Sequence, residues 1–261
     1  EFDVKDPDLC YYAAISANDE IDQFSNGFSQ YPSTLEEIGE NAFRSFGDNS
    51  HGFGQRLMEY LILPQSLKKL GKGAFEDAGI RAIYIAGPQA ISERCFQGGG
   101  LRKVILGDNV KIIERVAFGQ CSRLEKVVFG RNIKVIGDWA FDGCISLTAL
   151  TIPSTVESFG GWEFIARSGV NTIVWKPKNF NNTMGDSPFN NGSEQITSFI
   201  FEEGVERIPN HICTGMPLLI SVVIPESVTH IGDWAFWGCT SLSSIISNAI
   251  TPPVLEGNDV F

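Results

Sequence analysis

The chain has 261 residues, a formal net charge of −11 and a pI of about 4.8. This acidity disfavours DNA and RNA as partners, because phosphate binding needs clustered lysine and arginine side chains. No apolar run reaches the roughly 18 residues that a membrane-spanning helix needs. The six cysteines include no Cys-x-x-Cys pair, so they do not predict a disulfide-dense mini-scaffold.

Residues 1–32 lack the repeated pattern that fills the rest of the chain. They contain a short apolar stretch, Cys10–Ile15, followed by a polar stretch that runs to Gln30. An array of repeats needs an atypical end unit to cover its apolar edge, so we predict that residues 1–32 form an N-terminal cap. The first residues, from Glu1 to Asp6, are typical of a mature or truncated N-terminus, which is compatible with a removed export signal.

From residue 33 to residue 250 the chain repeats a unit of about 23 residues. The stretch Ile231–Cys239 (IGDWAFWGC) nearly reproduces Ile136–Cys144 (IGDWAFDGC). Such a short period predicts a solenoid, in which each turn contacts only its neighbours. We align the units on the phenylalanine of the Ala-Phe pair, called the phenylalanine position below, and assign to it Phe43, Phe75, Phe96, Phe118, Phe141, Phe164, Phe189, Cys213, Phe236 and Phe261.

Each unit opens with a Leu-x-x-Ile-x-Ile pattern that predicts a β-strand, because apolar and polar residues alternate and many are β-branched. A proline or glycine ends the pattern, at Pro64, Gly107, Gly130, Pro153 and Pro225. A unit of about 23 residues is too short for a strand and a long helix, so a short strand, a turn or a 3₁₀ segment should form the return side. Successive strands then stack in parallel.

The complete unit, Leu-x-x-Ile-x-Ile-Pro-x-x-Val-x-x-Ile-Gly-x-x-Ala-Phe-x-x-Cys, resembles the BspA type of leucine-rich repeat from about Ser33 onward. The resemblance implies a right-handed leucine-rich-repeat solenoid, mostly β, with a parallel β-sheet on its concave face and short strands, 3₁₀ segments or turns on its convex side. Residues 251–261, which contain Pro252 and Pro253, are expected to close its C-terminal end.

The resemblance also implies an exported bacterial protein, at the cell surface or outside the cell. Characterised relatives are adhesins for extracellular-matrix proteins or for other cells, although a shared fold does not fix a shared function. Three units depart from the pattern, one of them because Ile212-Cys213 replaces the Ala-Phe pair. Around Phe164, Glu163 replaces the alanine and Arg167 replaces the cysteine, and an asparagine-rich stretch at 176–188 interrupts the next unit. Its side-chain oxygens could ligate Ca²⁺, but ordinary loop chemistry explains them as well.

Nothing in the sequence predicts catalysis, a metal site or a cofactor. Cys121, Cys144 and Cys239 share a position that other units fill with apolar residues such as Ala78, which predicts core thiols. A Cys121–Cys144 disulfide is conceivable by distance, but parallel side-chain directions argue against it. No histidine shares this position, so zinc is not expected. His51, His211 and His230 belong to no recognisable catalytic triad.

The candidate site is the outward side of the predicted sheet. One outward position, called the outward column below, is mostly apolar and consists of Ile62, Tyr84, Ile105, Val128, Thr151, Val174, Ile200, Val223 and Ile246. Strand propensity alone could explain these residues. A continuous apolar stripe would also fit a protein partner, possible partners including extracellular-matrix proteins. Of these residues, we predict that Tyr84, Ile105, Val128, Thr151, Val174, Ile200 and Val223 bind the partner.

The adjoining outward column contributes Lys103 and Lys126 to the predicted binding site, close to Arg81 and Arg102. These cations could form a basic patch for an acidic segment or an anionic glycan, or simply a solvated face. Trp139, Trp162 and Trp234 share a position just before the Ala-Phe pair. They could form an aromatic ladder that stacks on sugar rings, although packing between adjacent turns is the favoured interpretation. A structural spacer in a surface layer is a third alternative.

Overall fold

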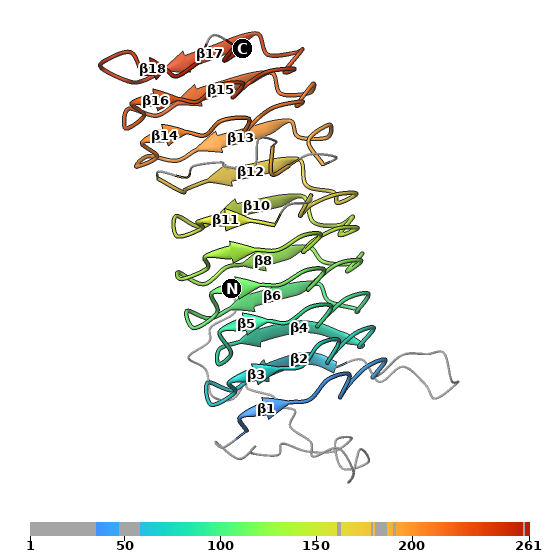
Figure 1. The fold of residues 1–261 in the computed structure, drawn as a ribbon. Helices are drawn as coiled ribbons and strands as arrows, with labels where there is room; N and C mark the ends of the chain where they lie inside the picture. Colours follow the sequence, from blue (N-terminus) through green and yellow to red (C-terminus); the bar gives the residue numbers. More distant parts are fainter. Residues whose placement is uncertain are drawn as a thin grey trace.

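The computed structural model describes residues 35–46, 58–160, 163–178, 180, 187–189, 192–257 and 259–261. The predicted N-terminal cap, residues 1–32, lies outside these ranges. The described residues form short parallel strands joined by turns, and they include no helix. Figure 1 shows the chain winding through successive turns that stack in one column. The predicted leucine-rich-repeat solenoid of parallel strands is confirmed.

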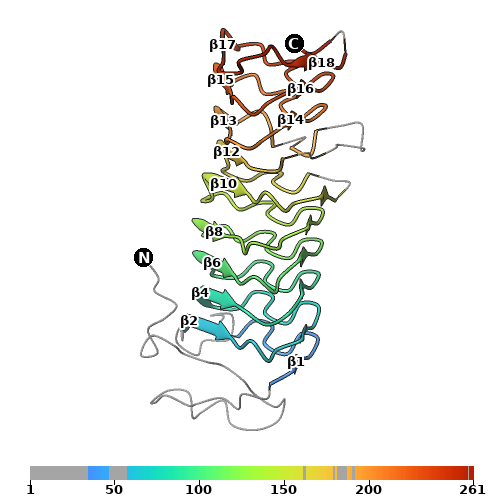
Figure 2. The same ribbon diagram turned by 90° about the vertical axis from the view of Figure 1, so that its left-hand side faces the viewer.

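Two kinds of strand lie on two sides of the solenoid (Figure 2), and they alternate along the chain except at β12 and β13, which are both long. The long strands are β2 (Met58–Leu63), β4 (Ile80–Ile85), β6 (Lys103–Leu106), β8 (Lys126–Val128), β10 (Ala149–Ile152), β12 (Thr172–Trp175), β13 (Ser198–Phe201), β15 (Ser221–Ile224) and β17 (Ser244–Ser247). The two-residue strands are β1 (Glu37–Ile38), β3 (Lys69–Leu70), β5 (Ala90–Ile91), β7 (Ile112–Ile113), β9 (Val135–Ile136), β11 (Ser158–Phe159), β14 (Arg207–Ile208), β16 (His230–Ile231) and β18 (Val254–Leu255).

The register of the long strands follows the alternation in the sequence. In β10, Leu150 and Ile152 are buried while Ala149 and Thr151 are exposed. Each of these residues pairs with the equivalent residue of β12, so that Leu150 lies beside Ile173. Because the side-chain period of a strand is two, every inward residue meets another inward residue of the next turn. The core is therefore continuous along the column.

A ladder of stacked rings runs through this core. Phe43, Phe75, Phe96, Phe118 and Phe141 stack in order, with centroids 5.0, 5.2, 5.4 and 5.5 Å apart and planes within 7° of parallel. Rings held at this spacing gain contact energy beyond simple burial. The ladder follows directly from placing the same residue at the same position in successive turns.

The shared cysteine position also belongs to the core. The Cys121 Sγ donates a hydrogen bond to the Phe96 carbonyl at 3.0 Å, and the Cys144 Sγ donates to the Phe118 carbonyl at 3.2 Å. Both thiols are buried, and burial raises the pKa of Cys121 to about 12. The described cysteines are all free, so the interpretation as core thiols is confirmed for Cys121 and Cys144. Cys239 occupies the same position in the last turn and is only half-buried. Cys10 lies outside the described residues.

The unit around Phe164 differs from the sequence alignment by one residue. The Phe118 amide donates to the carbonyl of Ala140, which directly precedes the next phenylalanine position, whereas the Phe141 amide donates to the carbonyl of Phe164. Ile165, not Phe164, therefore occupies the phenylalanine position. By the same shift Ser168 stands at the cysteine position, so the assignment of Arg167 to it was wrong. The strands on either side keep one constant offset, since Phe159 pairs with Ile136 and Thr172 with Ala149, so the residue gained before the phenylalanine position is lost again before Thr172.

Two corners of each turn adopt the left-handed backbone conformation. Two residues before the phenylalanine position, Asn41, Arg94, Val116, Trp139, His211 and Trp234 have φ values between 51° and 58°. Two residues after it, the position holds Gly98, Gly143, Gly215 and Gly238, but also Gln120 with φ 60°. This conformation is energetically unfavourable for L-residues, and most of all for a β-branched residue such as Val116. The chain tolerates these corners because the neighbouring turns fix them by backbone hydrogen bonds.

Replacing Val116 with asparagine should stabilise the protein. Asparagine tolerates the left-handed conformation that valine resists, and Asn41 already occupies the equivalent corner. We expect the free energy of unfolding to rise by about 1 kcal/mol, measured by urea denaturation. Val110→Asn serves as the control, since it places the same residue at a buried position and should destabilise. No gain from Val116→Asn would show that this corner carries no strain.

The last residues continue the repeat. β18 pairs in parallel with β16, and the Phe236 amide donates to the Val260 carbonyl at 2.8 Å. Phe261 stacks on Phe236 with centroids 5.6 Å apart. Residues 251–261, expected to close the end, therefore supply another short strand and another ring at the phenylalanine position.

Candidate functional site

The outward column lies along the side of the solenoid that the long strands form. We call this side the long-strand face. The members of the outward column differ in exposure. Ile62 is buried, and Tyr84, Ile105 and Val174 are half-buried. Val128 is 38% exposed, Ile200 46% and Val223 48%, and Thr151 is exposed between them. The strand register pairs Ile105 with Val128, Thr151 with Val174, Val174 with Ile200, and Val223 with Ile246. The exposed members, called the stripe below, therefore lie on one face, in three successive sheets.

The cations predicted beside this stripe do not form a uniform basic patch. Lys103 is half-buried and Lys126 is exposed, as neighbours in the pairing of β6 with β8. Arg81 pairs with Glu59 at 2.6 Å, and Arg102 lies 3.4 Å from Glu125. Carboxylates therefore offset both arginines, which weakens the local field that an anionic ligand would meet.

The tryptophans do not form one ladder. Trp139 is half-buried, and the Arg115 guanidinium lies 4.7 Å from the centroid of its ring, in a cation–π contact. Trp162 lies outside the described residues. Trp234 instead belongs to an exposed aromatic cluster near the C-terminus, with its ring 5.5 Å from that of Trp237 and 5.5 Å from that of His211. Packing between turns, the favoured interpretation, accounts for Trp139.

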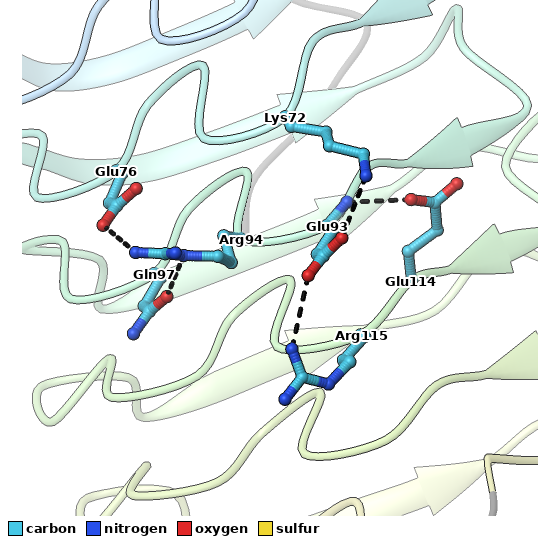
Figure 3. A network of polar contacts seen from close by, with 7 residues as sticks. All are labelled: Lys72, Glu76, Glu93, Arg94, Gln97, Glu114 and Arg115. Atoms are coloured by element: carbon cyan, nitrogen blue, oxygen red, sulfur yellow. Dashed lines mark hydrogen bonds and ion pairs between the residues drawn. The ribbon is translucent and has the colours of Figure 1, made fainter.

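A network of charges on the corner before the Ala-Phe pair was not anticipated from the sequence (Figure 3). Glu93 accepts from Lys72 of the preceding turn at 3.1 Å and from Arg115 of the following turn at 3.3 Å. The Glu114 carboxylate accepts from the backbone amide of Glu93 at 2.9 Å. Lys72, Glu93 and Arg115 all stand three residues before the phenylalanine position, so their charges alternate from turn to turn. We call these three residues the charge ladder.

Replacing Glu93 with glutamine tests the charge ladder. The pKa of Glu93 lies below its usual value of about 4.5, mainly because the Lys72 side chain donates a hydrogen bond to its carboxylate. Because the pKa of Glu93 is lower in the folded than in the unfolded chain, the ionised carboxylate stabilises the fold at pH values above the ordinary pKa. This stabilisation is lost as the pH falls through the pKa of the folded chain. At neutral pH and low salt we expect a loss of about 1 kcal/mol in the free energy of unfolding, which shrinks in acid. Glu125→Gln, which removes one exposed pair, should change little; equal effects from the two variants would contradict a ladder.

Two buried carboxylates are held by contacts between turns. Asp142 accepts from Gln120 at 2.7 Å and from two nitrogens of Arg167, at 2.9 and 2.5 Å, so both of its oxygens are used. One oxygen of Glu76 accepts from Arg94 at 2.7 Å and from Arg44 at 3.2 Å. Charge-assisted hydrogen bonds of this kind stabilise the stacking of turns. In the part of the chain that the structure describes, no group of three or more histidine, cysteine or acidic residues could hold a metal ion.

The repeat, its stacked core and its strand order can now be compared with known families. A family model described as "BspA type Leucine rich repeat region" matches in six copies, over residues 27–90, 48–168, 89–216 and 215–251. The chain belongs to this family. The BspA-type assignment accounts for the phenylalanine ladder and the cysteine position as features of one repeated unit. The search of curated proteins finds no match. None of the described residues forms a helix that is both long and apolar enough to cross a membrane.

Several solved structures of bacterial leucine-rich-repeat proteins resemble this BspA-type chain. The pneumococcal vaccine antigen PcpA is 16% identical, with 80% of this chain and 63% of that chain covered and a TM-score of 0.46. The T. pallidum leucine-rich-repeat protein is 16% identical, with 76% of this chain and 71% of that chain covered and a TM-score of 0.38. A Bacteroides ovatus leucine-rich-repeat protein is 20% identical, with 85% of this chain and 77% of that chain covered and a TM-score of 0.32. The chain thus spans less than two thirds of the pneumococcal antigen, and likenesses at these scores carry no functional argument.

Proposed function

We propose that this BspA-type chain is a non-enzymatic recognition protein, exported to the bacterial surface, that binds a protein partner through the long-strand face. The observation that carries the proposal is the exposed part of the outward column. Val128, Ile200 and Val223 are large apolar side chains that stay more than a third exposed, whereas the inward neighbours Phe199 and Val222 on the same strands are buried. An apolar stripe of this kind, flanked by polar residues, is typical of a protein interface.

The neighbours of the stripe favour protein over nucleic acid or a strongly anionic ligand. Ser198 and Ser221 flank Ile200 and Val223 on their strands, so the surroundings of the stripe are neutral and able to form hydrogen bonds. Arg81 and Arg102 are offset by carboxylates. A rigid parallel sheet also presents its side chains at fixed spacing, which lowers the entropy lost on binding. Extracellular-matrix proteins, the ligands of characterised relatives, are the first partners to test.

The test replaces Val128, Ile200 and Val223 together with aspartate. These side chains point outward, so we expect circular dichroism and the thermal midpoint to change little. Binding to a panel of extracellular-matrix proteins, measured by surface plasmon resonance, should weaken by at least about 100-fold, because each buried charge costs several kcal/mol at an apolar interface. The control replaces Glu125, Glu157 and Glu226 with aspartate, a change that keeps the negative charge at each position. Binding that survives the triple change would remove the long-strand face as the site.

A glycan site is the second candidate, favoured by the exposed pair of Trp234 and Trp237. Their rings lie 5.5 Å apart and are inclined at 34°, and Trp237 is 50% exposed. Aromatic faces of this kind can stack on the apolar side of a sugar ring. Glycan-array binding that is lost in Trp237→Ala, and kept in Trp139→Ala, would locate a glycan site there. The asparagine-rich stretch, the other part of this hypothesis, lies largely outside the described residues.

A further inference from the structure

The charges on the long-strand face are gathered in one part of it. The strands β2, β4, β6 and β8, with the turns that enter β6 and β8, carry more cations than carboxylates, although the whole chain has a net charge of −11. The cations are Arg81, Arg102, Lys103, Arg123 and Lys126, and the carboxylates are Glu59 and Glu125. The two carboxylates pair with Arg81 and Arg102. Arg123 and Lys126 are exposed and form no ion pair with any residue that the structure describes. We call this part the charged half.

The part of the face that follows carries no charge. The strands β10, β12, β13 and β15, with the three residues that precede each, contain no charged side chain. Leu218 and Ile220, in the turn that enters β15, are 48% and 60% exposed and extend the apolar surface of Ile200 and Val223. They stay exposed although the next turn is in place, where the Ser243 amide donates to the Ile220 carbonyl. We call this part the uncharged half.

Small side chains connect the two halves. In the turns after β8 the position of Lys126 is filled by Ala149, Thr172, Ser198 and Ser221. Such side chains let another main chain lie close to the sheet, and three of them offer hydroxyl groups for hydrogen bonds. The strands β10, β12 and β13 separate β8 from β15 (Figure 1), which makes the distance roughly 20 Å at about 4.8 Å between strands. An extended chain covers that distance with about six residues.

Charge complementarity indicates which chain fits. An acidic segment is repelled by most of this acidic protein but attracted to the charged half, where Arg123 and Lys126 have no internal partner. An apolar segment is favoured at the uncharged half, since no charged group there has to lose its water. A segment that is acidic throughout, or apolar throughout, matches only one half.

We propose that the long-strand face binds one extended segment of a protein partner, with its acidic residues at Arg123 and Lys126 and its apolar residues at Ile220 and Val223. About six residues separate the two groups in the segment. This inference rests on the function proposed above, because it specifies the partner of the same face. It adds Arg123, Leu218 and Ile220 to the site, none of which belongs to the outward column.

Selection of displayed random peptides, long enough to span both halves, on the purified chain tests the chemistry of the partner. We expect the enriched peptides to combine acidic residues with an apolar group about six residues away. Enriched peptides that are only acidic or only apolar would overturn the proposal. Failure to enrich any peptide would overturn it as well, because the two halves would then not suffice to hold an extended chain.

The most enriched peptide, synthesised with a fluorescent label and titrated by anisotropy, tests each half separately. Arg123→Gln with Lys126→Gln should raise the dissociation constant about 10-fold at low salt and less at high salt, because salt screens exposed charges. Ile220→Ser should raise it about 10-fold at both salt concentrations, since the lost contact is apolar. If either variant binds the peptide as the parent does, the two-part site is wrong.

Matched controls lie at the short strands on the other side of the solenoid. Lys111→Gln with Lys134→Gln removes two cations from the turns that enter β7 and β9, and should leave the dissociation constant unchanged. Ile112→Ser removes an exposed apolar side chain from β7 and should likewise have no effect. Equal losses in the site variants and these controls would mean that net charge or general apolarity drives binding, which contradicts the proposal.

The extracellular-matrix panel separates this inference from the proposed function. Suppose that the aspartate variant of Val128, Ile200 and Val223 loses a matrix protein that the Arg123, Lys126 and Ile220 variants still bind with parental affinity. The long-strand face is then the site, and only the two-part partner is wrong. If the aspartate variant keeps its matrix protein, the function proposed for the face fails, and this inference fails with it.

Discussion

Replacing Phe118 with alanine should cost about 3–5 kcal/mol in the free energy of unfolding, the largest loss expected from one substitution in this chain. Phe118 is fully buried and stacks on Phe96 at 5.4 Å and on Phe141 at 5.5 Å. Its removal leaves a cavity between two rings that cannot close together, because the strand spacing of the flanking turns holds them apart. Each turn contacts only its neighbours, so the loss weakens the two interfaces beside the site.

The control for this prediction is Phe261→Ala at the end of the chain. Phe261 occupies the same position in its turn, but it stacks on one ring only and is 58% exposed. Its removal should cost less than about 1 kcal/mol, since little area is buried and no enclosed cavity forms. Urea denaturation followed by circular dichroism measures both values. Similar losses in the free energy of unfolding for the two variants would mean that a ring stacked on both sides stabilises the protein no more than a ring stacked on one side.

Alkaline pH should destabilise the protein strongly before most other groups titrate. Burial raises the pKa of Cys121 to about 12, from an ordinary value of about 9.0. Burial also raises the pKa values of Cys95, Cys144 and Cys213. Below the ordinary value the thiols are protonated in both the folded and the unfolded chain, so stability does not depend on them. Above it the unfolded chain releases protons that the folded chain retains, and the free energy of unfolding falls by about 1.4 kcal/mol per pH unit for each thiol.

The measurement is urea denaturation under reducing conditions from about pH 8 to about pH 11, where we expect a total loss of several kcal/mol. Cys121→Ala is the matched variant, because Ala78 fills the same position in another turn. It should be less stable than the parent at neutral pH, yet its stability should decline less steeply with pH, by the contribution of one thiol. An unchanged slope would show that the Cys121 thiol ionises in the folded protein as readily as in the unfolded one.

The sequence was sufficient for those features that recur at every turn. Alternation in Leu150–Ile152 fixed which side of the strand is buried, and repetition of Phe96, Phe118 and Phe141 predicted one continuous core. Alternation likewise indicated the exposed residues Val128, Ile200 and Val223 of the outward column, but Ile62 of the same column is buried, and the binding role of the column stays a prediction. The charge ladder was missed although its signal was present: Lys72, Glu93 and Arg115 hold one position with alternating sign.

Features that depend on backbone conformation could not be derived in this way. The stretch Trp162-Glu163-Phe164 aligns with Trp139-Ala140-Phe141 at its tryptophan and its phenylalanine, but in the structure Ile165 occupies the phenylalanine position. Hydrogen bonds between turns decide this register, and a comparison of letters does not contain them. The left-handed corners were likewise hidden, because Val116 and Trp139 are residue types that rarely adopt them. Exposure along the outward column, from the buried Ile62 to Val223, depends on how each neighbour packs.

The shift beside Phe164 shows how a turn of such an array can be rebuilt without any change in its length. The residue gained before the phenylalanine position is lost again before Thr172, so the sheets on both sides keep their pairing. One corner of the solenoid therefore moves by a residue, and the turns beyond it keep their contacts. The same shift within a strand would turn its buried side chains toward solvent, because the side-chain period of a strand is two.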